Sequence, residues 1–99
     1  MLSVKIHKSY RDIVAVCDLN LLGIKLEEGK RELHVRENFF KDREVNHEQA
    51  VVLMKEYAQE DATFNIIGPE SINAALDAGI INKEDISTIQ SVPFALILL

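Results

Sequence analysis

Residues 63–72 carry the clearest architectural signal in this chain of 99 residues, and they read Thr63-Phe64-Asn65-Ile66-Ile67-Gly68-Pro69-Glu70-Ser71-Ile72. The run 63–67 predicts a strand, and Gly68-Pro69 ends it because proline suits the first position of a new helix. Ile72, Ala75 and Leu76 form the buried stripe of that helix, and Gly79 suits the left-handed residue after it. A short strand over 85–89 would then complete a right-handed crossover with parallel strands.

Further strands are expected before and after this unit. Residues 2–7 alternate apolar and polar side chains, which is typical of a half-buried strand. Residues 13–17 are apolar on both faces, as in a central strand, and a short polar loop would join the two in an antiparallel hairpin. Residues 31–37 alternate again, whereas residues 27–30 read as a turn and residues 38–42 as a loop. Residues 92–99 are apolar enough to lie inside a sheet.

A second helix is expected to begin after Asn46. The sequence Asn46-His47-Glu48-Gln49 fits a capping box, and one helical stripe then carries Ala50, Leu53, Met54, Tyr57 and Ala58. Together the elements predict a single domain over residues 1–99 of the α+β class. We expect a single mixed β-sheet of five or six strands with two helices packed on one face.

Composition and charge narrow the possible functions. Apolar residues make up 47% and charged residues 27%, which excludes a disordered chain, a collagen-like fibre and a coiled coil. Residues 1–45 carry nine Lys and Arg against eight Asp and Glu, whereas residues 46–99 carry two against eight. Only residues 1–45 could therefore form a surface that binds a polyanion such as a nucleic acid. With one cysteine, no signal peptide and no bilayer-spanning apolar run, we expect a cytoplasmic protein that does not bind a membrane.

The residues with reactive side chains form no recognisable motif. His7, His34, His47 and Cys17 lie on separate predicted elements without chelating spacing, so neither a metal nor a cofactor is expected. Cys17 is expected to be a small buried hydrophobe. The Gly68-Pro69 junction is expected to be an ordinary helix start. No catalytic residue is assigned.

The most suggestive cluster combines basic side chains with two adjacent phenylalanines: Lys30, Arg31, Arg36, Phe39, Phe40, Lys41 and Arg43. Basic groups beside exposed aromatic rings hold single-stranded RNA, and Phe and Arg are also enriched at protein interfaces. Because acidic residues are interleaved, the local charge nearly cancels and a protein partner is favoured. RNA and a merely solvated surface both stay open.

Several segments of the chain resemble a known family. They are residues 18–29, 33–40, 65–68 and 79–81, with Ala75 and Val92-Pro93. Together they resemble an archaeal family of small uncharacterised proteins, domain of unknown function 424, over nearly the whole chain. Relatives often carry Phe-Tyr followed by glycines where this chain has Phe40-Lys41-Asp42, so the chain departs from the family pattern in this loop. The family has no assigned activity, so the resemblance implies no catalytic residues. It implies a cytosolic archaeal protein. A link to translation or RNA handling is a hypothesis that rests on the cluster of basic side chains and not on the resemblance.

The leading hypothesis is a non-enzymatic binding module whose working surface is the 18–43 region. Its partner would be a protein within an RNA-processing or translation-related assembly. One alternative is a small enzyme that uses Asp18, His34 and Glu37 in a shallow cleft. Another is a self-associating structural protein, a homodimer formed through residues 94–99 if that strand lies at a sheet edge.

Overall fold

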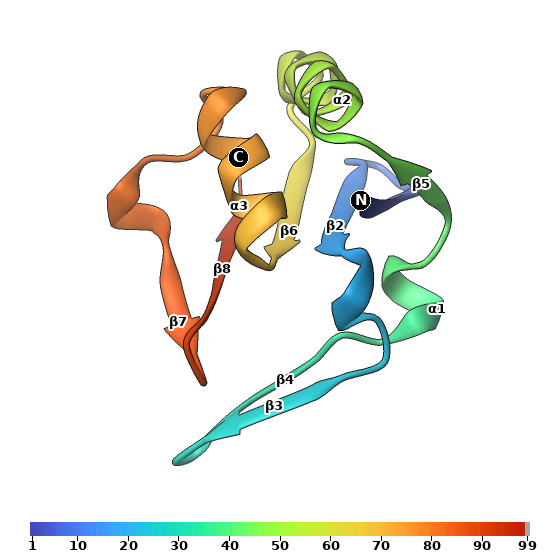
Figure 1. The fold of residues 1–99 in the computed structure, drawn as a ribbon. Coiled ribbons are helices and arrows are strands. Elements are labelled where there is room, and N and C mark those ends of the chain that lie inside the picture. The colour runs from blue at the N-terminus through green and yellow to red at the C-terminus, as the bar shows by residue number, and fades with distance from the viewer. Residues whose placement is uncertain (99) are drawn as a thin grey trace.

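The computed structural model describes residues 1–98 and arranges them as strands, helices and two short 3₁₀ turns (Figure 1). Along the chain the elements are β1 (Leu2–His7), β2 (Ile13–Asp18), η1 (Leu19–Leu21), β3 (Lys25–Glu28), β4 (Arg31–His34), α1 (Glu37–Phe40), β5 (Arg43–Val45), α2 (His47–Gln59), β6 (Thr63–Ile67), α3 (Pro69–Asp77), η2 (Lys83–Asp85), β7 (Ser87–Ile89) and β8 (Val92–Ile97). Six strands form one sheet in the order β5-β1-β2-β6-β8-β7, and β3 pairs with β4 in a separate hairpin.

The N-terminal hairpin and the central position of β2 are both confirmed. β1 pairs with β2 in antiparallel register from Leu2 opposite Asp18 to His7 opposite Ile13. On its other side β2 pairs in parallel with β6. Residues 14–17 are fully buried because both faces of this central strand are covered. β6 and β7 both run antiparallel to the intervening β8, so they are parallel to each other, as the 63–89 pattern predicts.

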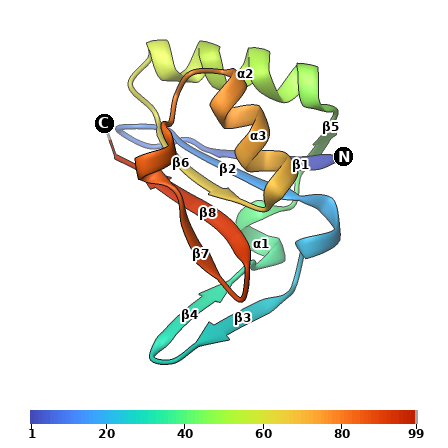
Figure 2. The same ribbon diagram turned by 60° about the vertical axis from the view of Figure 1, so that its left-hand side comes forward.

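Two helices cover one face of the sheet, and the short helix α1 lies on the other (Figure 2). On the first face, Val16 and Phe64 of the sheet pack in one core with Met54 of α2 and Ala75 of α3. A second, smaller core on the opposite face contains Cys17. The predicted α+β class, with a mixed sheet of six strands and two helices on one face, is therefore confirmed.

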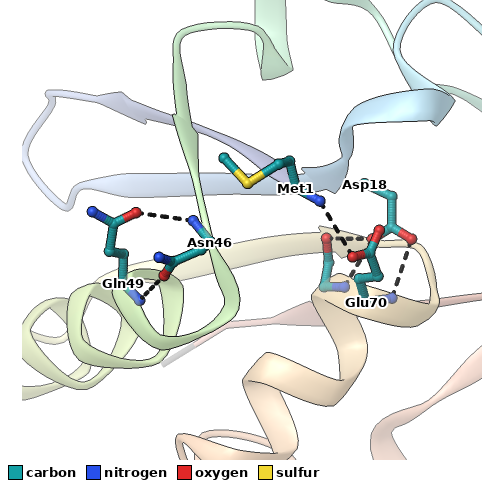
Figure 3. Close-up of polar contacts among 6 residues, drawn as sticks. Met1, Asp18, Asn46, Gln49 and Glu70 are labelled. Carbon is teal, nitrogen blue, oxygen red and sulfur yellow. Dashed lines mark hydrogen bonds and ion pairs between the residues drawn. The ribbon is translucent and has the colours of Figure 1, made fainter.

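Both long helices begin with signals that the sequence shows. The Gln49 amide N–H donates to Asn46 Oδ1 at 2.8 Å, and the Asn46 amide N–H donates to Gln49 Oε1 at 2.9 Å (Figure 3). This reciprocal capping box satisfies donors at the start of α2. α3 has Pro69 at its first position, and Gly79 beyond its end has a φ of +74°.

The segment between β2 and α2 contains more regular structure than the sequence predicts. Part of the expected turn at 27–30 belongs to β3, which pairs with β4. β4 ends at His34 instead of continuing to residue 37, and the expected loop at 38–42 contains most of α1. β5 follows and pairs with β1. These elements have only three or four residues each, too few for a hydrophobic period to appear in the sequence.

β8 lies inside the sheet, as its apolar sequence predicts. A homodimer through residues 94–99 would require this segment to lie at a sheet edge. Phe94 does not lie at an edge, because it pairs with Ser87 on one side and Ile67 on the other. Leu99 lies outside the described residues. The sheet ends instead at β5 and β7. None of the helices formed by residues 1–98 has the length and apolar character needed to cross a membrane.

Candidate functional site

Polar side chains of β1 hold the short helix α1 against the sheet. Three alternate residues each donate one hydrogen bond of 2.8 Å to a carbonyl of α1: Ser3 to Phe40, Lys5 to Asn38 and His7 to Phe39. The last carbonyls of a single-turn helix have no intrahelical partner, so β1 supplies the missing donors. The face of β1 that the alternation predicts to be wet is therefore covered in part, and Ser3 is buried.

The two adjacent phenylalanines of α1 have different environments. Phe40 is buried in the smaller core. Phe39 is half-buried and stacks on the His7 ring, with centroids 4.3 Å apart and planes 21° apart. Its ring also meets Phe40 edge-to-face at 5.2 Å. Phe39 is therefore held in place by aromatic neighbours, and part of its ring remains at the surface.

A concave site of about 440 Å³ lies beside α1, on the face of the sheet opposite α2 and α3. We call this site the α1 pocket. Its walls come from β1, β4, α1, β6, β8 and the connection between β4 and α1. The lining residues are His7, Leu33, His34, Arg36, Asn38, Phe39, Phe40, Asn65, Ile67 and Leu96.

The lining of the α1 pocket combines hydrogen-bond donors with apolar surface. Arg36 contributes a permanent positive charge, His7 and His34 contribute imidazoles, and Asn38 and Asn65 contribute amides. No Asp or Glu is among these lining residues. A wall of this kind suits a ligand with a negative group beside an apolar one, because a desolvated anion needs donors around it. Across residues 1–98, His, Cys, Asp and Glu side chains nowhere gather in threes as a metal site would require.

The structure divides the predicted binding residues among separate surfaces. Arg36, Phe39 and Phe40 line the α1 pocket. Lys41 is exposed at the end of α1, and Arg43 lines a different groove between β5 and α2.

The other two predicted binding residues, Lys30 and Arg31, belong to the β3–β4 hairpin, which extends away from the main sheet (Figures 1 and 2). Arg31 donates to Glu28 at 3.0 Å and to the Thr88 carbonyl at 2.6 Å. The Gln90 amide N–H donates to Glu28 at 2.8 Å and, with Arg31, holds the pKa of Glu28 below its ordinary value. Arg31 therefore helps to attach the hairpin to β7.

The acids and the histidine of the enzyme hypothesis are not gathered in the α1 pocket. His34 lines it, but neither Asp18 nor Glu37 does. Glu37 is exposed at the start of α1, beside Gly23. Asp18 is 2% exposed on the helix-bearing side of the sheet, so it is not placed for acid–base work with His34.

Asp18 instead holds the start of α3 (Figure 3). Its Oδ1 accepts from the Ser71 amide N–H and the Ser71 hydroxyl, both at 2.8 Å, and its Oδ2 accepts from the Glu70 amide N–H at 3.1 Å. A helix N-terminus favours an anion because its first N–H groups have no intrahelical partner. The start of α3 is therefore capped, as expected. The capping carboxylate comes from β2 and not from a residue next to the helix.

Four residues of the α1 pocket lie outside the predicted 18–43 surface: His7, Asn65, Ile67 and Leu96. They come from β1, β6 and β8, far from residues 30–43 in the chain. One signal for Asn65 was present in the sequence, because it is the polar residue that interrupts the apolar run from Phe64 to Ile67. Nothing local distinguishes Leu96 from the other apolar residues of β8.

Cys17 is expected to resist alkylation in the folded protein. Burial, and to a smaller extent the Asp18 carboxylate, raises the pKa of the thiol to about 12. At about pH 8 only about one thiol in ten thousand would then be the reactive thiolate. We expect negligible reaction with a thiol reagent over minutes in native protein and complete reaction after unfolding in guanidinium. Rapid labelling of the native protein would contradict the prediction.

A family model matches most of the chain. Residues 7–99 match the family described as "Protein of unknown function (DUF424)". The chain is also similar to a solved structure described as the crystal structure of an uncharacterized conserved protein from Methanopyrus kandleri. That match has a TM-score of 0.87 and 25% identity, and it covers 97% of this chain and 89% of the other. No curated protein matches the chain. Neither description names a ligand or an activity.

Proposed function

The chain belongs to the DUF424 family, and we propose that it is a non-enzymatic binding module that holds a protein partner at the α1 pocket and the surrounding 18–43 surface. The partner belongs to an RNA-processing or translation-related assembly in the cytoplasm. A single cysteine supports the compartment, since disulfide-stapled small domains belong to oxidising ones. The family description assigns no chemistry, so the support for a binding role comes from the site.

One observation carries this proposal: Arg36 and the half-buried Phe39 both line a concavity on the face of the sheet opposite α2 and α3. Arginine and aromatic side chains that line a pocket are the usual energetic centres of protein interfaces. The hydrogen bonds from β1 to α1, with the stacking of His7, hold Phe39 in position before any partner arrives. Preorganised side chains lose less conformational freedom when a partner binds, which favours affinity.

Affinity capture with charge-reversal variants tests the proposal. Tagged wild type, Arg36→Glu and Lys55→Glu would be exposed to extract from the source organism, with and without nuclease. Lys55 is the matched control, because it is an exposed cation on α2, across the sheet from the α1 pocket. We expect proteins that survive nuclease treatment and remain with Lys55→Glu to be lost with Arg36→Glu.

Thermal unfolding should first show that both variants are folded. If wild type and Arg36→Glu capture the same proteins in the same amounts, the proposal is wrong. Loss of every Arg36-dependent protein on nuclease treatment would indicate RNA as the direct partner and would equally overturn a protein partner.

A further inference from the structure

We infer that the α1 pocket receives a short acidic segment of a partner protein, with one apolar side chain in the pocket and carboxylates around Arg36. This inference rests on the proposed function and specifies the partner's chemistry. The site would distinguish its ligand by two features together, negative charge and an apolar anchor.

The charge of the lining favours an acidic ligand. The whole chain carries a net charge of −5, yet the α1 pocket has one arginine, two histidines and no carboxylate in its wall. Lys8, Lys25 and Arg31 are each engaged in an ion pair with a side-chain carboxylate. Arg36 makes no ion pair with any of residues 1–98. Its exposed guanidinium is thus available to take a carboxylate in a bidentate geometry.

The apolar part of the site favours a protein segment over a simple anion. Leu96 lines the pocket although it is 57% exposed, and Leu98, two residues further along the chain, is 84% exposed. Apolar surface that remains in water next to a pocket gains free energy when a partner's apolar side chain covers it. The volume of about 440 Å³ accommodates one large side chain and its neighbours, as an extended segment of a protein would present them.

The aromatic geometry favours protein over single-stranded RNA. Base recognition uses a free aromatic face on which a base can stack. Phe39 already stacks on His7 and contacts Phe40 edge-to-face. The exposed Leu96 and Leu98 side chains also offer no hydrogen-bond donor for an RNA phosphate. We therefore favour a protein segment and include RNA among the probes of the test.

Titration of isotope-labelled full-length protein with defined probes, followed by NMR amide shifts, tests the inference. The probes are acetyl-Glu-Asp-Leu-Glu-Asp-amide, the same peptide with Ser for Leu, the same peptide with Lys for each acid, and oligouridylate RNA of matched length. We expect the acidic leucine peptide to shift amides of residues 33–40 and of Leu96. It should bind about tenfold more tightly than either altered peptide.

Variants then identify the contacts. Arg36→Gln should weaken the acidic leucine peptide about fivefold, and Leu96→Ser should weaken it about threefold. Lys55→Gln, the matched removal of a remote positive charge, should leave its affinity unchanged. Amide spectra of each variant without peptide report whether the fold is retained. Leu96 is exposed, so its replacement removes little from the core.

Three outcomes would overturn the inference. They are shifts outside the α1 pocket, equal affinity for the acidic and basic peptides, and RNA that shifts residues 33–40 where the acidic peptide does not. The capture experiment separates the inference from the proposed function. If Arg36-dependent protein partners are captured and the acidic leucine peptide fails, the binding module stands and only the acidic class is wrong. If neither experiment depends on Arg36, both fail.

Discussion

Replacing Gly68 with alanine is expected to destabilise the protein by about 4 kcal/mol, because two costs add at one position. Gly68 has a φ of +112°, which residues with a Cβ rarely adopt. A Cβ there would also lie 2.5 Å from Oδ1 and 2.8 Å from Oδ2 of Asp18. The buried carboxylate cannot move aside without losing its hydrogen bonds to the start of α3. Urea unfolding of wild type and variant measures the difference.

Gly29→Ala is the matched control for this substitution. Gly29 also has a positive φ, +62°, but apart from Gly29 and its two chain neighbours no atom lies within 4 Å of the position that its Cβ would occupy. Only the backbone strain remains there, so we expect a loss of about 1 kcal/mol. Equal losses at the two glycines would show that contact with Asp18 contributes nothing.

Asp18→Ala is expected to have the second large effect, lowering the free energy of unfolding by about 3 kcal/mol. The substitution removes the acceptor for two backbone N–H groups and for the Ser71 hydroxyl, which is buried. Buried donors without a partner cost about 1–3 kcal/mol each, and water entering the site would offset part of that cost. Because about 1 kcal/mol moves the midpoint of a domain this size by about 4–8 °C, thermal unfolding resolves the effect readily.

Two further variants separate burial and geometry from charge at this site. Asp77→Ala removes an exposed carboxylate that contacts His47 at 2.7 Å, and we expect it to cost less than about 1 kcal/mol. Asp18→Asn keeps one acceptor oxygen, so its cost should fall between those of wild type and Asp18→Ala. An Asp18→Ala protein as stable as Asp77→Ala would refute the capping role.

Gly68→Ala should also cost less stability in the Asp18→Ala background, since the clash with the carboxylate is then gone.

The fold was largely predictable because its main elements have local signatures. The capping box at Asn46 and Gln49, the helix start at Pro69 and the positive φ of Gly79 involve residues within a few positions of one another. The apolar run at 13–17 likewise shows a strand covered on both faces. The short elements β3, α1 and β5 escaped prediction because each is stabilised by the strand or face that it packs against and not by its own pattern.

Within the candidate site, the sequence pointed to Arg36, Phe39 and Phe40 but also to Lys30, Arg31, Lys41 and Arg43, which lie on other surfaces. Proximity in sequence suggested one cluster, whereas the projecting hairpin separates its ends (Figure 2). Asp18 shows the opposite error. The enzyme alternative placed it in a shallow cleft with His34 and Glu37, yet it is buried because its partners come from the start of a helix about fifty residues later.

The amino-acid sequence by itself determined the α+β class, the limits of the longer helices and strands, and the family, because these depend on patterns of neighbouring residues. Only the tertiary structure brought His7, Arg36, Asn65 and Leu96 to one concavity and placed the Asp18 carboxylate at the start of α3. Those contacts depend on strand order and register, which are decided by packing between segments far apart in the chain.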